Sequence, residues 1–187
     1  MKSIKELIDN NINLDRNNTE EKTVAEDINN YSSPAIVDSL KESVNIHWQQ
    51  AMELTGQSAH LKRWGYEKLA NLFAEYGKEE HDHAAIAISR LEFFDTDYQP
   101  LIVSPRVWKR HDIRAIIEFN LEGVRNAAVV EKRIIAQARM SGDEITAQEI
   151  IPLLKGSDDG ILEFEKMLRL IDDMGLDNFL TLISNPL

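Results

Sequence analysis

The feature that most constrains the fold is a set of four long stretches in which apolar residues recur at helical spacing. The first starts at Pro34, directly after the N-cap candidates Ser32-Ser33, and is expected to run to about Arg63. Trp64-Gly65 interrupts this pattern, and a second amphipathic stretch continues to about Phe94. The first two helices should therefore pair as an antiparallel hairpin.

A long connection separates this hairpin from the second half of the chain. Between residues 95 and 110 the helical period stops at two prolines, and Leu101-Ile102-Val103 is extended in character. A tight turn would need far fewer residues. The stretch is therefore expected to cross over from one helical hairpin to another.

Two further long helices are expected after the crossover. The third should run from about Asp112 to Ala138. The fourth should begin near Thr146, because Thr146 and Glu149 have the spacing of a capping box. Pro152 should bend its first turns.

The end of the chain completes the expected architecture. Gly175 should close the fourth helix, and residues 176–183 can form a short fifth helix. The sequence thus predicts an all-α protein, a four-helix bundle with one long crossover and a short C-terminal fifth helix, over residues 34–187. Residues 1–33 are polar, and we expect a flexible extension that is either solvated or a docking arm for a protein partner.

The net charge limits the kinds of molecule that the protein is expected to bind. The 187 residues carry a net charge of -11, which argues against nucleic acid or an anionic membrane as the main partner and favours cations. Acidity that simply keeps a protein soluble is the alternative.

The sequence has no apolar run of membrane-spanning length and no signal-peptide pattern, so a cytoplasmic location is expected. It also has no cysteine, so a metal site would depend on His and carboxylate ligands, which suit iron, manganese or zinc.

Three polar residues interrupt the apolar stripes of the first hairpin. His47 lies within the stripe of the first helix, and Glu80 and His83 lie within that of the second. A spacing of three residues places Glu80 and His83 on one helix face, where both can approach a common point in the bundle. Burial of an unpaired carboxylate is costly, which favours a metal or a hydrogen-bonded partner for Glu80. A solvated, charge-rich helix surface is the alternative.

The second hairpin offers weaker ligands. Asn120 lies near the inward stripe of the third helix, and Ser157 and Gly160 take the corresponding places on the fourth. Neither Ser157 nor Gly160 is a good metal ligand. Any metal site should therefore be lopsided, with its strong donors mainly on the first hairpin, and a symmetric di-iron centre is not present in full.

Several segments resemble the bacterioferritins in both order and spacing. These segments are Trp64-Gly65-Tyr66-Glu67-Lys68-Leu69, Glu79-Glu80-His81-Asp82-His83-Ala84, Asn120-Leu121-Glu122-Gly123-Val124-Arg125-Asn126, and the stretch from Leu170 to Leu180. The resemblance covers about residues 34 to 184. It implies a ferritin-like bundle and a cage-forming homo-oligomer built from two-fold dimers.

The resemblance also assigns roles to individual positions. Glu80 and His83 match the family's Glu-x-x-His ligands on the second helix, while His47 and Asn120 fall where its first-helix and third-helix carboxylates stand. His81 takes the place of the methionine that binds haem between two subunits. These positions imply iron as the metal, with an incomplete or weakened ferroxidase centre, and make haem a second possible cofactor.

Four functions therefore compete. The first is an iron-storage or iron-binding cage with a mononuclear or weak centre at His47, Glu80 and His83. The others are a non-catalytic ferritin-like interaction protein, a haem-binding protein that uses His81, and a zinc site formed by two histidines and one carboxylate.

Overall fold

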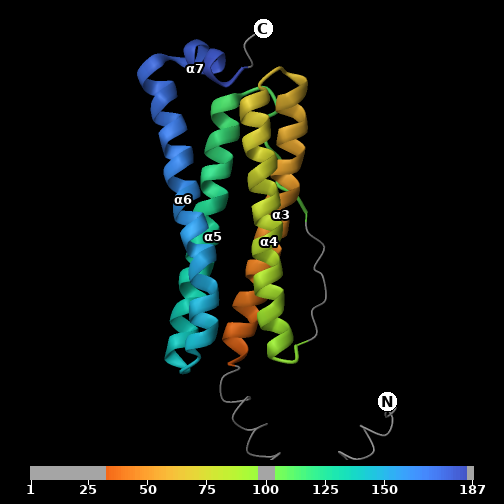
Figure 1. Ribbon diagram of the computed structural model, residues 1–187, viewed down its shortest axis with the longest axis vertical. Coiled ribbons are helices and arrows are strands. Elements are labelled where there is room, and N and C mark those ends of the chain that lie inside the picture. Colours follow the sequence, from red (N-terminus) through yellow and green to blue (C-terminus); the bar gives the residue numbers. More distant parts are fainter. Residues whose placement is uncertain (1–32, 97–103, 185–187) are drawn as a thin grey trace, which may run out of the picture.

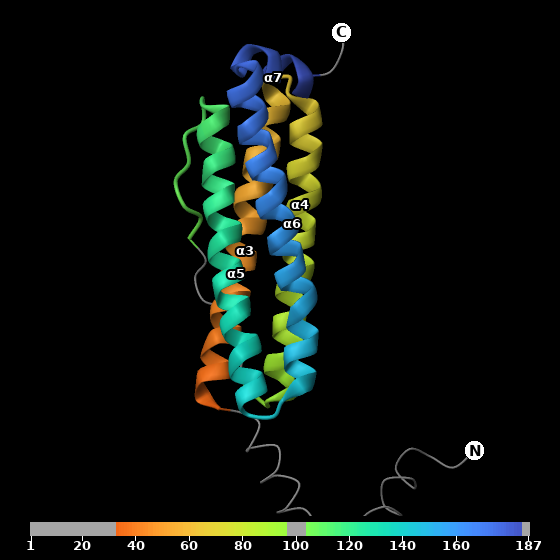
Figure 2. The ribbon, with the colours of Figure 1, turned by 90° about the vertical axis from the view of Figure 1, so that its left-hand side faces the viewer.

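The computed structural model describes residues 33–96 and 104–184, and helices make up most of that part of the chain (Figure 1). The helices are α3 (Pro34–Arg63), α4 (Glu67–Phe93), α5 (Ile113–Met140), α6 (Glu144–Met174) and α7 (Leu176–Ile183). The first four run along one common axis as two antiparallel hairpins, and α7 lies across one end of the bundle (Figures 1 and 2). The predicted all-α four-helix bundle with a short fifth helix is confirmed.

The ends of the helices mostly follow the sequence signals. Ser33 caps α3, where its hydroxyl oxygen accepts a hydrogen bond from the backbone N–H of Ile36. Asp112 caps α5 in the same way. Gly65 and Gly175 both have positive φ angles, of 86° and 81°, which glycine adopts without strain at the ends of α3 and α6.

The predicted start of the fourth helix was wrong. Asp143, and not Thr146, is the N-cap of α6, and its carboxylate accepts a hydrogen bond from the backbone N–H of Thr146. Thr146 lies inside the helix, where its buried hydroxyl accepts two hydrogen bonds from Arg90 of α4. An ionised carboxylate at the N-cap also interacts favourably with the helix dipole, so Asp143 is the better cap. The helix continues through Pro152, which lies on its exposed side.

Two apolar clusters fill the bundle, one toward each end. The cluster near α7 contains Phe73, Phe164 and Phe179, and the other contains Leu40, Leu91 and further aliphatic residues. On α3 the second cluster ends at Val44 and the first begins at Leu54, and the buried residues between them include His47, Gln50 and Glu53. The middle of the bundle therefore holds a polar layer between two dry cores.

The crossover is tied to this polar layer. Arg106 donates hydrogen bonds from Nε and Nη2 to the carboxylate of Glu53, at 3.2 and 3.0 Å, and the Glu53 side chain is fully buried. The guanidinium also lies 4.0 Å from the ring centre of Phe119.

Two predicted features lie outside the described residues: the extension over residues 1–33, apart from Ser33, and the extended run Leu101-Ile102-Val103. None of the described helices is long and apolar enough to cross a membrane.

Candidate metal centre

The predicted ligands His47, Glu80 and His83 come together in the polar layer. One potential ligand atom from each of the three lies within 4.8 Å of the other two. Oε2 of Glu80 is 2.6 Å from Nδ1 of His47 and 4.0 Å from Nδ1 of His83. The side chains are 1% exposed for His47, 12% for Glu80 and 20% for His83. Two imidazoles and a carboxylate are a donor set that suits iron or zinc.

His47 sits between two carboxylates. Its Nδ1 faces Glu80, and its Nε2 is 3.2 Å from Oε1 of Glu131 on α5. Burial alone would lower the pKa of His47, but the close contacts and charges of Glu131 and Glu80 outweigh burial and raise it to about 9. Without a metal, a protonated imidazole thus offsets part of the negative charge of these two carboxylates. A cation that binds at Nδ1 must displace the proton there.

His83 is in the opposite electrostatic state. Burial lowers its pKa, and the charge of His47 lowers it further, against the opposing effect of Glu80. Its Nδ1 is buried and has no hydrogen-bond partner within the described part of the chain. A neutral imidazole with a free nitrogen directed toward a carboxylate is ready to bind a metal ion.

The ring of His83 lies directly against the backbone of α6. A Cβ atom placed on Gly156 would be 2.9 Å from Cε1 and 3.3 Å from Nε2 of His83, closer than side chains normally pack. Glycine at this position therefore makes room for the imidazole. The sequence interpretation did not single out Gly156.

Glu131 is a buried carboxylate beside the candidate centre that the sequence interpretation missed. Its side chain is fully buried, and its Oε1 accepts a hydrogen bond from the hydroxyl of Ser157 at 3.2 Å. A signal was present, because Glu131 falls on the inward stripe of α5 between Ala127 and Ile134. A carboxylate inside an apolar stripe was the same signal that identified Glu80.

Asn120 is buried on α5, but the structure gives it other contacts. Its Nδ2 donates hydrogen bonds to Oε1 of Gln57 at 2.7 Å and to the carbonyl oxygen of Ile116 at 2.8 Å. It lines the same cavity as Glu80 and His83. A role for Asn120 as a metal ligand stays a prediction, and Glu131 is the α5 side chain in direct contact with His47.

The fourth helix brings no metal ligand to the centre. Ser157 is buried and donates its hydrogen bond to Glu131, and a Cβ atom on Gly160 would meet Val124 of α5. The three residues that converge all belong to α3 and α4. The arrangement is lopsided, with the strongest donors on the first hairpin.

A cavity of about 270 Å³ opens beside the three residues. Gly156 and Gly160 form part of its wall, and the exposed carboxylates Glu79 and Asp159 and the half-buried Glu163 also line it. Burial and the negative charges of Glu163, Glu79 and Glu75 raise the pKa of Tyr76, another lining residue, to about 12. The cavity thus has a negative potential that attracts cations.

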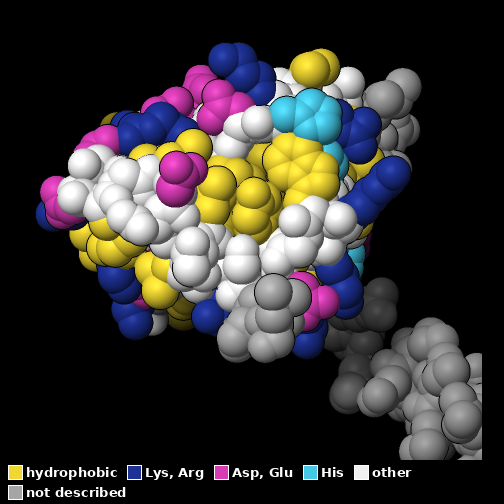
Figure 3. All heavy atoms as spheres, turned by 90° about the horizontal axis from the view of Figure 1, so that it is seen from above, with side chains coloured by type: hydrophobic (Ala, Val, Ile, Leu, Met, Phe, Trp, Pro, Cys, Tyr) yellow, Lys and Arg dark blue, Asp and Glu magenta, His cyan; other side chains and the backbone are white. Residues whose placement is uncertain are grey.

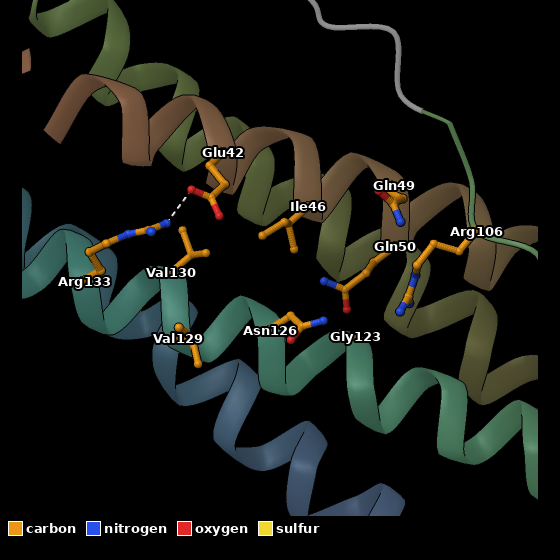
Figure 4. A pocket seen from close by; sticks show the side chains of 10 residues that line it. All are labelled: Glu42, Ile46, Gln49, Gln50, Arg106, Gly123, Asn126, Val129, Val130 and Arg133. Atoms are coloured by element: carbon orange, nitrogen blue, oxygen red, sulfur yellow. Dashed lines mark hydrogen bonds and ion pairs between the residues drawn. The ribbon is translucent and has the colours of Figure 1, made fainter. Parts of the chain in front are cut away.

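A second cavity, of about 340 Å³, lies between α3 and α5 (Figure 4). An ion pair between Glu42 and Arg133 stands at one end and Arg106 at the other (Figure 4). Gln50 lines both cavities, and its amide nitrogen is buried without a hydrogen-bond partner in the described structure. This second cavity contains no histidine, so it does not offer a comparable metal site.

His81, the predicted haem ligand, points away from the centre. It is exposed on α4 and lines an open groove together with residues of α3 and Gly77, namely Ala51, Met52, Thr55 and Gly56. The groove faces outward between the helices of the first hairpin. The structure therefore places His81 on a surface that a second molecule could contact.

Comparisons with known proteins agree with this architecture. The sequence model of the ferritin-like domain matches residues 37–174, which include all of α4, α5 and α6 and nearly all of α3. A search of curated proteins found no match.

Proposed function

The chain belongs to the ferritin-like domain family, and from this we propose that it is an iron-binding protein with a single-cation centre at His47, Glu80 and His83. The observation that carries the proposal is the convergence of these three buried or half-buried side chains inside the bundle. The family generally binds iron. Iron is here the substrate or cargo of the protein.

The donor set supports one strong cation position. Two histidines and one carboxylate leave open positions for water or oxygen on a bound ion. A symmetric pair of irons needs a carboxylate and a Glu-x-x-His from the second hairpin as well, and α6 offers Ser157 and glycines instead. We therefore expect oxidation of Fe(II) by oxygen to be slow in comparison with an intact di-iron centre.

The cavity mouth, Glu80 and the two histidines each have a separate role in this proposal. The acidic cavity mouth concentrates cations, Glu80 supplies the charged ligand, and the two histidines complete the site in a largely dry environment. His47 gives up its Nδ1 proton when a cation binds there. Glu80 and Glu131 stabilise the protonated imidazole before binding, and their negative charges favour the bound cation afterwards.

Metal binding to the full-length protein tests this function. We expect one Fe(II) or Zn(II) per chain, with affinity lost in His83→Ala. His111→Ala is the matched control, because His111 is an exposed histidine that stacks on Trp64. Absence of metal binding by the folded protein would contradict the proposal and favour a non-catalytic interaction protein.

We further propose that the chain assembles into a closed homo-oligomer, as the resemblance to bacterioferritin implies. The family generally forms homo-oligomers. Hydrophobic side chains gather on the α7 end of the molecule (Figure 3), where Met174, Leu176 and Leu182 are exposed. Exposed apolar groups of this kind are typical of contact surfaces.

Haem binding at His81 is a second candidate, favoured by the groove of small residues beside it. If two copies meet at this groove, a haem between them could take one imidazole from each. Haem reconstitution with an absorption spectrum tests this candidate. A bis-histidine spectrum that is lost in His81→Ala and kept in His111→Ala supports it. Met52→Ala is a second control, because Met52 lines the same groove and offers an alternative axial ligand.

A further inference from the structure

Each ring nitrogen of His47 faces a different carboxylate, and this division has a chemical meaning. We propose that Glu131 is a positioning residue that holds His47 through Nε2, so that Nδ1 is the atom presented to the cation. The inference rests on the proposed metal centre and adds to it a residue from the second hairpin.

The distances separate the two sides of the imidazole ring. Nδ1 is 2.6 Å from Oε2 of Glu80, the same oxygen that lies 4.0 Å from Nδ1 of His83. Nε2 is 3.2 Å from Oε1 of Glu131. Glu131 is not among the side chains whose ligand atoms lie within 4.8 Å of one another. The cation position is therefore on the Nδ1 side, and Glu131 is on the other side of the ring.

Glu131 is itself held in place. Ser157 of α6 donates a hydrogen bond to its Oε1, and the side chain is completely buried. The second oxygen, Oε2, has no hydrogen-bond partner in the described structure. A buried carboxylate with an unsatisfied oxygen is costly, and the charge of His47 is the compensation within reach.

The contact between His47 and Glu131 has the distance of an ion pair, although the ring N–H is not aligned for a straight hydrogen bond. Metal-binding histidines usually donate their other ring N–H to a carboxylate or carbonyl oxygen. Such a partner fixes the tautomer and makes the metal-binding nitrogen more basic. Glu131 is the carboxylate that faces Nε2, so a small turn of the ring would let it accept this hydrogen bond, and Ser157 donates a hydrogen bond to Glu131 in turn.

The geometry also gives the second hairpin a role. The resemblance to bacterioferritin leads one to expect direct ligands from the third and fourth helices. In this chain, Glu131 and Ser157 reach the centre from α5 and α6 and act on a histidine of α3. The two hairpins thus meet at one imidazole.

Zinc is a suitable probe, because it has no redox chemistry and binds histidine nitrogen at about 2.0–2.1 Å. The experiment compares zinc-loaded crystal structures and zinc affinities of the full-length protein with those of Glu131→Leu and Glu131→Gln. In the unaltered protein we expect zinc on Nδ1 of His47, with Nε2 hydrogen-bonded to Glu131. Glu131→Leu should weaken zinc binding by about 10- to 100-fold and release the orientation of the ring. Glu131→Gln keeps an acceptor and should keep the ring orientation, with a smaller loss of affinity.

A matched control separates positioning from general loss of stability. Glu53→Gln removes a similarly buried carboxylate that holds the crossover and does not touch His47. It should leave zinc affinity and the ring of His47 unchanged.

The outcomes distinguish this inference from the proposed function. Failure of the unaltered protein to bind zinc at His47, Glu80 and His83 would overturn the proposed centre itself. Zinc bound there through Nε2, zinc ligated directly by Glu131, or unchanged affinity and ring orientation in Glu131→Leu would overturn only the positioning role. If Glu131→Leu fails to fold, the comparison of Glu131→Gln with Glu53→Gln decides the question, because an equal loss of affinity in both variants would also overturn it.

Discussion

Gly156 provides a test in which metal binding should weaken without a matching loss of stability. Gly156→Ala adds one methyl group on α6, at a point 2.9 Å from Cε1 of His83. Ordinary contacts begin at 3.4 Å, so the imidazole must move by at least about 0.5 Å. The methyl group meets the tip of a side chain, which can turn away, and does not meet backbone.

The expected magnitudes follow from this displacement. Metal–ligand distances tolerate only about 0.2 Å, so a shift of this size should weaken zinc binding by about tenfold or more. The metal-free protein should not be destabilised in proportion. Alanine is favoured over glycine inside a helix by about 1 kcal/mol, so the free energy of unfolding should stay constant or rise by up to that amount.

Two measurements check the prediction. Zinc affinity is measured by competition with a chromophoric chelator, and stability by thermal unfolding of the metal-free protein. Gly160→Ala is the matched control, because it makes the same change one turn later on α6 but meets only Val124, at 3.3 Å. Full zinc affinity in folded Gly156→Ala would refute the argument that glycine at position 156 gives the His83 ring the room that it needs to bind metal.

Three further predictions concern assembly, catalysis and pH. Light scattering at neutral pH and moderate salt should report a closed oligomer, and a monomer would count heavily against the cage. The double change Ser157→Glu with Gly160→His should speed the oxidation of Fe(II) by oxygen, because it gives α6 a carboxylate and a histidine beside the centre. An unchanged rate in the folded variant would show that the lack of ligands on α6 does not limit the oxidation. In the metal-free protein, the pKa of His47 is raised from 6.5 to about 9, so its stabilising contribution should be complete below about pH 6.5 and disappear as the pH rises through 9. A Tm that falls across this range in the unaltered protein but not in His47→Gln is the expected result, and equal Tm profiles would contradict it.

The fold could be predicted from sequence because its signals are local. Apolar periodicity defined four helices, and Pro34, Gly65 and Gly175 marked three of their ends. The start of α6 was misassigned because two capping signals lie three residues apart, and only the folded structure shows that Thr146 is needed by Arg90 of the neighbouring hairpin.

The candidate centre could be predicted only in part, because it joins residues from different helices. His47, Glu80 and His83 stood out as polar residues within apolar stripes, and the structure brings them together. Glu131 gave the same signal, but the position matched to the family on the third helix was Asn120. Gly156 gave no signal, since the reason for a glycine there is the ring of a histidine more than 70 residues away in sequence.

The polar layer also has a consequence for how the bundle is aligned. α3 buries polar side chains along much of its length: Ser39, Ser43, His47, Gln50, Glu53, Gln57 and His60. Several of them have partners on other segments: His47 with Glu80, Glu53 with Arg106, Gln57 with Asn120, and His60 with the carbonyl oxygen of Arg110.

A helix with a purely apolar face can slide by one turn, about 5.4 Å, and still find apolar neighbours. The same slide of α3 would separate all four pairs at once and leave buried polar groups unsatisfied, at about 1–3 kcal/mol each. Buried polar pairs of this kind can select one register from several that apolar packing alone would allow. In this bundle, His47 and Glu80 of the candidate metal centre therefore belong to the set of pairs that favours a single longitudinal position of the first helix.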